Sequence, residues 1–181
     1  MSKDLNEVIL GSGKLYVALF NGGAMPADTA IETDDNNVGK IKGGATLTYK
    51  PTIYDVVDDD EFVVKRIVTK EEVTFKSGIL TWDITNLDKL STASFVDDTT
   101  NHERIIKVGG KSKLDSYVIR FVHTKDDGTK LRMTIVGNSS NGFAMKFDPA
   151  KETVIDAEFK ALSQDDGTLV EIRDGYTAVN A

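Results

Sequence analysis

The sequence contains no cysteine, and His102 and His123 are the only two histidines among its 181 residues. Without cysteine the chain can form neither a disulfide framework nor a thiolate metal site, and it cannot use a cysteine nucleophile. Two imidazoles are also too few for most histidine-based metal sites. We therefore expect no metal centre and no cofactor.

Long apolar segments are missing as well. No stretch approaches the roughly 18 consecutive apolar residues that indicate a membrane-spanning helix. The N-terminal sequence Met1–Glu7 has no apolar segment after a basic start, as a secretory signal would have. We expect a protein that begins in a cytoplasm and does not enter a membrane.

Basic residues are in the minority, with 22 lysines and arginines against 29 aspartates and glutamates and a formal net charge of −7. This balance argues against tight binding to nucleic acid, which depends on cations that neutralise phosphates. One interpretation of the acidity is ordinary solubility. The other is a surface past which DNA must move without adhering to it.

The motifs of common catalytic sites are absent too. The sequence has no Walker A motif, and Gly11-Ser12-Gly13 lacks the third glycine of a dinucleotide-binding turn. Glu71 and Glu72 are neighbours in an expected strand, so they should point to opposite faces and cannot share acid–base work. The cluster Asp58–Glu61 lacks the spacing of a calcium loop and is typical of a solvated loop tip. We expect no catalytic residues and no enzymatic activity.

Alternating and strand-forming residues dominate what is present. The expected strands cover residues 14–20, 45–49, 53–57, 62–68, 72–76, 79–84, 105–108, 117–122, 131–136, 143–147, 154–162 and 169–172. One short helix is expected over 86–93, with Thr85 as its cap, and 95–104 is expected to be a loop. The pattern predicts a single, mainly β domain over residues 1–181, an antiparallel β-barrel or β-sandwich with one short α-helix.

Four stretches of the sequence carry a resemblance to a known family. They are Val8–Phe20, Asn37–Tyr49, Lys70–Trp82 with the adjoining Asn86–Leu90, and Asp165–Leu169. In their order along the chain these segments resemble the major tail tube proteins of long-tailed bacteriophages, particularly of phages that infect Gram-positive hosts.

The resemblance implies a structural protein of the virion tail, assembled in the host cytoplasm. Copies would form hexameric rings that stack into a tube, and their sheets would join so that one continuous barrel lines the channel. Double-stranded DNA would pass through without specific binding. The other expected partners are a tape measure protein, a tail terminator and a baseplate or tip protein.

The same resemblance implies which segments contact neighbouring copies. They are an N-terminal arm over residues 1–13, the loop after the first strand and a long hairpin over about 49–75. This hairpin contains more apolar residues than a free ribbon should expose, so it folds either onto its own core or onto a neighbouring copy. The residues expected at the subunit interface are Tyr54, Val56, Phe62, Val64, Glu71 and Glu72.

A function of another class stays open, namely a soluble β-sandwich module that binds carbohydrate or acts in adhesion. Such modules usually bind sugars on exposed aromatic side chains. The only tryptophan, Trp82, falls in an expected strand, where a place in the core or in an interface is the simpler interpretation.

Overall fold

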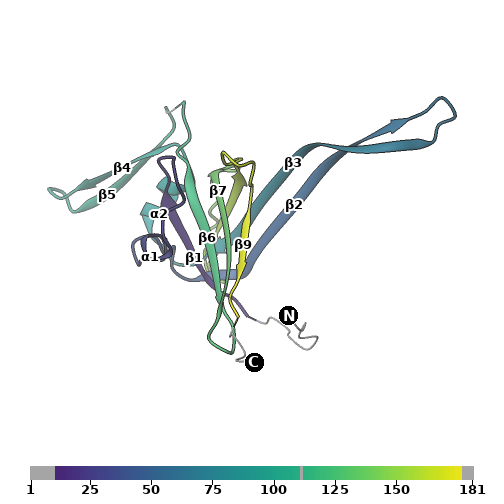
Figure 1. Ribbon diagram of the computed structural model, residues 1–181. Coiled ribbons are helices and arrows are strands. Elements are labelled where there is room, and N and C mark those ends of the chain that lie inside the picture. The colour runs from purple at the N-terminus through teal and green to yellow at the C-terminus, as the bar shows by residue number, and fades with distance from the viewer. Residues whose placement is uncertain (1–10, 111, 177–181) are drawn as a thin grey trace.

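The computed structural model describes residues 11–110 and 112–176. In this part of the chain the protein is mainly β, with 51% strand and 6% helix (Figure 1). The strands are β1 (Lys14–Leu19), β2 (Ile41–Val57), β3 (Val63–Ile79), β4 (Ala93–Asp98), β5 (Glu103–Val108), β6 (Tyr117–Thr124), β7 (Lys130–Ser139), β8 (Ile155–Ala161) and β9 (Glu171–Asp174). The two short helices are α1 (Asp28–Ile31) and α2 (Ile84–Lys89), where the sequence predicted one.

Seven of the strands form one antiparallel sheet in the order β1-β6-β7-β8-β3-β2, to which β9 is added on β7. One edge of β7 is shared by two partners, because Leu131–Thr134 pairs with β9 and Gly137–Ser139 pairs with β8. The strands at the two ends of the order, β1 and β2, are not paired with each other. The predicted mainly β, antiparallel fold is confirmed and is consistent with a β-sandwich, and the alternative of a closed barrel is wrong.

Strand β6, which lies between β1 and β7, is buried on both of its faces. Tyr117, Ile119 and Phe121 belong to the main hydrophobic core, together with side chains of β3, β8 and α2. Val118 and Val122 belong to a second, smaller cluster that includes Ile31 of α1. Burial on both faces explains why apolar residues follow one another here almost without a break.

Arg120 interrupts that apolar run, and its side chain is buried on the face that α1 covers. Its Nη1 donates to Oδ1 of Asp28 at 2.6 Å, and its Nε donates to Oγ1 of Thr134 at 3.0 Å. Asp28 also accepts two hydrogen bonds from Arg173 of β9, at 2.5 and 3.2 Å. A buried guanidinium needs such partners to offset its loss of water, so α1 is fixed to the sheet through Asp28.

Glu32, directly after α1, makes a second set of bonds to the same sheet. Its carboxylate accepts from Nε of Arg132 at 2.6 Å and from Nζ of Lys130 at 3.2 Å. Burial alone would raise the pKa of Glu32, but these two bonds and the charges of Arg132 and Lys130 together outweigh it and lower the pKa. The pKa of Asp28 is lowered by the hydrogen bond from Arg173, against an opposing effect of burial, with help from the charge of Arg120.

These lowered pKa values predict how stability depends on pH. A carboxyl group whose pKa is lower in the folded protein stabilises it above the ordinary pKa of about 4, and that stabilisation is lost as the pH falls through the lowered value. We therefore expect the free energy of unfolding, measured with urea, to fall steeply below about pH 4. In Asp28→Asn/Glu32→Gln the stability at pH 7 should be lower and the loss on acidification smaller.

A matched control is Asp127→Asn, which removes a surface carboxylate whose partner is the nearby Thr129. This control should keep most of the acid dependence of the wild type. Curves for the double variant and the wild type that run parallel between pH 5 and pH 3 would contradict the assignment.

The helix predicted over 86–93 lies instead at Ile84–Lys89. Its cap is Asp83, whose Oδ1 accepts the backbone N–H of Thr85 at 3.0 Å, and not Thr85 as predicted. The hydroxyl of Thr85 donates to the same oxygen at 2.9 Å, so this side chain supports the cap without being it.

The segment 95–104, predicted to be a loop, is mostly a hairpin of β4 and β5. Its apolar residues pair across the strands, Phe95 with Ile106 and Val96 with Ile105. The polar residues that suggested a loop are concentrated in the turn, where Oδ1 of Asp98 accepts the N–H groups of Thr100 and Asn101.

Two predicted strands, over 79–84 and 143–147, are wrong. Ser77-Gly78 does not turn the chain into a strand over 79–84, because β3 continues through it to Ile79. Gly78 serves a close approach of strands, since a Cβ there would lie 2.8 Å from the carbonyl oxygen of Lys42. The segment 143–147 is not a strand, and Phe143 and Met145 contact the main core from irregular backbone.

Candidate assembly surface

Two hairpins leave the body in different directions, β4–β5 on the left of Figure 1 and the longer β2–β3 on the upper right. Strands β2 and β3 have 17 residues each and pair from Ile41–Ile79 to Val57–Val63. None of the side chains from residue 50 to residue 72 is buried. We call these residues the distal hairpin; eight residues of β2 at about 3.3 Å each give it a reach of about 26 Å.

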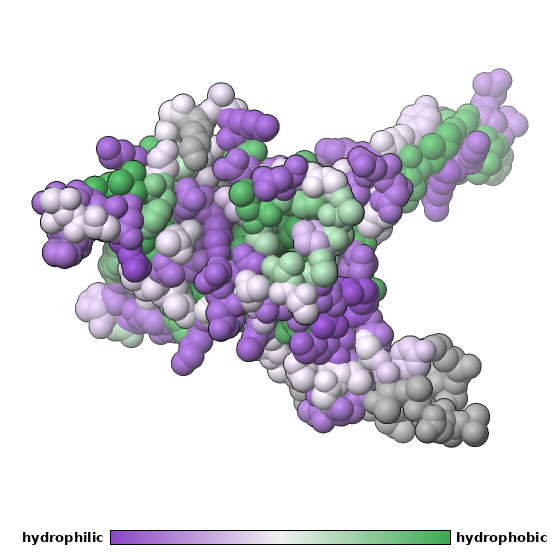
Figure 2. All heavy atoms as spheres, turned by 60° about the vertical axis from the view of Figure 1, so that its left-hand side comes forward, coloured by the Kyte–Doolittle hydropathy of each residue, from purple (hydrophilic) through white to green (hydrophobic). Residues whose placement is uncertain are grey.

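Large apolar side chains are exposed all along the distal hairpin. They are Ile53, Tyr54, Val57, Phe62, Val63, Val64, Ile67 and Val68, with exposed fractions between 40% and 68%. Figure 2 shows hydrophobic surface along this arm, with hydrophilic residues toward its end. The alternative that the hairpin folds onto its own core is therefore wrong, and the remaining alternative is cover by another chain.

The predicted interface residues of the distal hairpin differ in position. Tyr54 and Val56 lie on one face, since alternate residues of a strand share a face. Val64 is the residue left unpaired where the register shifts near the tip, and Phe62 belongs to the turn, where its side chain is 68% exposed. The structure places all four on one arm but does not collect them into a single face.

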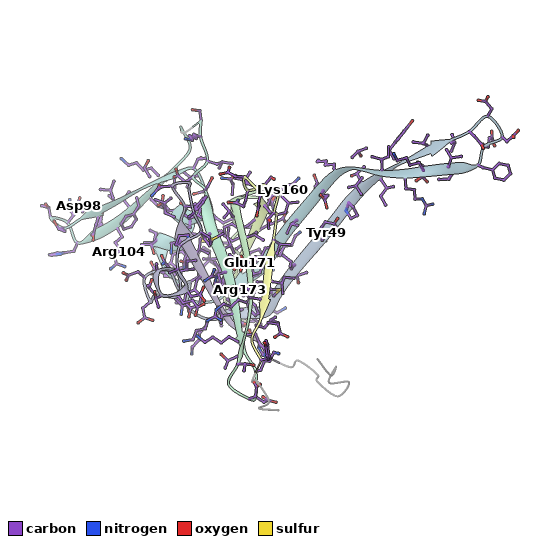
Figure 3. The ribbon with its side chains drawn as sticks, in the orientation of Figure 1. Tyr49, Asp98, Arg104, Lys160, Glu171 and Arg173 are labelled. Carbon is purple, nitrogen blue, oxygen red and sulfur yellow. The ribbon has the colours of Figure 1, made fainter. Side chains whose placement is uncertain are left out.

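Glu71 and Glu72 lie at the base of the distal hairpin. The hydroxyl of Tyr49, labelled in Figure 3, donates to Oε1 of Glu71 at 2.6 Å. Glu72 is held by Nζ of Lys70 at 2.5 Å and Nζ of Lys160 at 3.1 Å. Hydrogen bonds from Lys70 and then Lys160 lower the pKa of Glu72 to about 2. The two carboxylates thus bind different groups, as expected for opposite faces.

The tip of the hairpin is the acidic cluster Asp58–Glu61. Oδ1 of Asp58 accepts the N–H groups of Asp60 and Phe62 at 3.1 and 2.8 Å, and Glu61 has a φ of 65°. Asp58 therefore builds the turn. Across 11–110 and 112–176, no group of three or more acidic, histidine or cysteine side chains is arranged to hold a metal ion.

Strand β2 also carries an open edge, because its partner in the sheet is β3 alone among the strands described. The opposite end of the sheet is partly covered. There, along β1, the backbone carbonyl of Asn36 accepts the N–H of Val17 at 2.8 Å, and the N–H of Val38 donates to the backbone carbonyl of Leu15 at 3.0 Å. An open edge of this length offers unpaired backbone groups to a further strand.

Little of the predicted N-terminal arm can be placed. Residues 1–10 lie outside the described residues, and Gly11, Ser12 and Gly13 lead into β1. His123 is buried in β6, and its Nδ1 lies 2.8 Å from the carbonyl oxygen of Ser12. The histidine therefore has a local structural contact, as expected for a strand residue near a turn.

A groove of about 930 Å³ is formed by loops beside β1, β6 and β9 together with residues Thr134, Ile135 and Val136 of β7. Its lining includes the exposed Leu114 and Leu162 and the carboxylates of Asp165, Asp166 and Glu171. Trp82, predicted in the core or in an interface, is 57% exposed and lies outside the strands. It is thus not a core residue, and it does not line this groove.

Comparison with known proteins adds no family: no protein-family model matches the chain, and no curated protein matches it in sequence. None of the helices described is long and apolar enough to cross a membrane. The functional interpretation therefore depends on the distal hairpin, the open edge of β2 and the distribution of charge.

Proposed function

We propose that the protein is a structural subunit of a tail tube, in a bacteriophage or in a related phage-derived injection device. Copies of the chain form hexameric rings, and the rings stack into a hollow tube around the path of the genome. The observation that carries this proposal is the distal hairpin, whose exposed apolar side chains another chain must cover. The four sequence stretches that resemble tail tube proteins support the same function.

The position of the hairpin favours rings over a symmetric pair. A projecting arm and the surface that receives it are different parts of the molecule, so each copy can receive the arm of one neighbour and give its own arm to another, in a head-to-tail contact. Head-to-tail contacts produce a closed ring when the rotation between copies closes, and a filament when it does not. The open edge of β2 fits this arrangement, because a strand of the next copy can complete the sheet there.

The charge of the chain suits a channel for DNA. With a net charge of −7, an assembly of many copies repels phosphate where its acids face the channel, and a basic lining would retain the genome. Tape measure, terminator and baseplate or tip proteins are the partners proposed at the ends and inside of the tube, and the virion tail is the proposed location. The role is structural and includes no catalytic step.

The alternative, a soluble binding module, has the exposed Trp82 in its favour. That side chain lies away from the groove, whose one aromatic lining residue is Phe20. A sugar site normally combines an aromatic platform with a concave polar surface, and here the two are separate. The tail tube subunit is therefore the better-supported function.

The proposal is tested by negative-stain electron microscopy of the concentrated protein, with its mass measured by light scattering. We expect hollow rods, or rings with the mass of about six subunits, because apolar arms associate by burying their exposed surface. A protein that stays monomeric at every concentration would count against self-assembly. A glycan-binding screen would then test the alternative.

A further inference from the structure

The register of β2 and β3 divides the distal hairpin into two faces. Residues directly opposite each other in an antiparallel pair share a face, and the next pair lies on the other face. One set of pairs, called the core-side face, continues the side of β3 that carries the buried Val73; it consists of Ile53–Val68, Asp55–Arg66 and Val57–Val63. The other set, called the outer face, consists of Tyr54–Ile67 and Val56–Lys65.

Both faces carry exposed apolar side chains. On the core-side face Ile53 and Val68 are each 53% exposed, and on the outer face Tyr54 is 59% and Ile67 40% exposed. A strand pair that packs against protein on one face and is exposed to solvent on the other is apolar on one face only. Apolar residues on both faces are what β6 shows inside this protein, where cores lie on both sides of the strand.

The charges on the two faces differ. On the core-side face the charges compensate each other, because Nε of Arg66 lies 3.1 Å from Oδ1 of Asp55. On the outer face Lys65 stands opposite Val56 and has no ion-pair partner among the residues described. The core-side face therefore fits an apolar neighbour, and the outer face fits a neighbour that combines apolar and acidic groups.

The chain itself has a surface of the second kind. The groove beside β1, β6, β7 and β9 exposes Leu114 and Leu162 at 44% and 41%. Its charged lining is Lys113, Asp115, Asp165, Asp166 and Glu171, so acidic groups are in the majority, and Glu171 is paired with Arg173 at 2.7 Å. Such a groove offers leucine side chains to Tyr54 and Ile67 and the carboxylates of Asp165 and Asp166 to Lys65.

We propose that the distal hairpin is held between two other copies of the chain, an inference that rests on the proposed function. Its outer face occupies the acidic groove of one copy, and its core-side face packs against a second copy. The hairpin is thus a wedge at a junction of three subunits, and each of its faces makes a separate contact.

The first test compares variants of the two faces by light scattering and electron microscopy. Ile53→Thr/Val68→Thr alters the core-side face, and Tyr54→Ser/Ile67→Thr alters the outer face. We expect each to raise the concentration needed for half-maximal assembly at least about tenfold, the effect of exposing a single buried aliphatic side chain. All four residues are exposed in the single chain, so both variants should unfold as the wild type does.

The second test uses charge reversal. Lys65→Glu should block assembly, and Asp165→Lys/Asp166→Lys in the same chain should restore it, because the two changes exchange the signs across the contact. Lys107→Glu on β5 is the matched control and should assemble normally.

The outcomes separate this inference from the proposed function. A wild type that assembles together with a face variant that assembles equally well overturns the two-sided contact and leaves the tube subunit standing. Failure of the groove variant to rescue Lys65→Glu overturns the assignment of the groove. A wild type that never assembles overturns both the inference and the proposed function.

Discussion

A chain in which residues 50–72 are replaced by an Asn-Gly turn is expected to fold as a stable monomer and to form no tubes. Tyr49 and Val73 are directly paired, and a two-residue turn is the shortest natural connection between such residues. None of the removed side chains is buried, so the core of the body stays intact. The change takes away the apolar arm that other copies must cover.

The expected sizes of the two effects differ greatly. The free energy of unfolding should change by about 1 kcal/mol or less, because the lost contacts are surface contacts and the connecting loop becomes shorter. Assembly should fall below detection in electron microscopy and light scattering, because several apolar side chains leave the interface together.

A full-length control separates the length of the hairpin from the charge of its tip. Asp59→Asn/Asp60→Asn keeps Asp58, whose carboxylate forms the turn, and should still assemble. Tubes formed by the shortened chain would show that the contact element lies elsewhere. A shortened chain without a cooperative unfolding transition would show that the hairpin belongs to the folding core.

Alternation of residue types was enough to predict the central strands. The runs over 117–122 and 154–162 match β6 and β8 to within two residues at each end, because their apolar residues alternate or continue as in buried strands. The same reasoning misjudged glycine at Gly78, where a close approach of strands and a turn have the same sequence signal. It also missed β4 and the first two residues of β5, because the polar turn between these strands hides the pairing of Phe95 with Ile106.

Sequence reasoning identified the long hairpin but not the direction in which its apolar side chains are presented. Residue types indicate that apolar side chains such as Tyr54 and Val64 must be buried against another surface. Only the register shows that the apolar side chains of the hairpin are divided between its two faces. Exposure likewise depends on tertiary structure, because Trp82 is a large apolar residue of the kind expected in a core and is nevertheless 57% exposed.

The ion network under α1 could not be predicted from sequence, because its members are far apart along the chain. Asp28 is separated by 92 residues from Arg120 and by 145 residues from Arg173. Helix α1 has four residues and no side-chain cap, so neither its length nor a capping residue predicts it from sequence. A single arginine within the apolar run of β6 was the one available signal, and it indicates a buried partner without naming it.

Replacing Arg120 by methionine is expected to cause a large loss of stability. Arg120 is 1% exposed, and its loss leaves Asp28 partly buried with fewer donors and Thr134 without its hydrogen bond. Breaking one partner of a buried ion pair costs about 3–5 kcal/mol. Arg173 still binds Asp28, so a value near the lower end, about 3 kcal/mol, is expected in urea unfolding.

Two further variants give this expectation a control. Arg173→Met removes a partner of the same carboxylate whose side chain is 41% exposed, and it should cost only about 1 kcal/mol because water screens the pair. In a double-mutant cycle, Asp28→Asn should reduce the cost of Arg120→Met, since the uncompensated charge is then gone. A value for Arg120→Met within 0.5 kcal/mol of the wild type, on the scale of ordinary surface changes, would contradict the network.

The same substitution also connects stability with assembly. Asp28 and Glu32 fix α1 to the sheet, and α1 lies in the connection that follows β1. The tail tube resemblance implies that this connection contacts neighbouring copies, so loosening it should weaken assembly even where the monomer stays folded. Both variants are compared at one temperature, 10 °C below the unfolding temperature of Arg120→Met. At that temperature we expect Arg120→Met to assemble less than Arg173→Met. Equal assembly by the two variants would show that the network supports the fold alone and leaves the contact surfaces of the subunit unchanged.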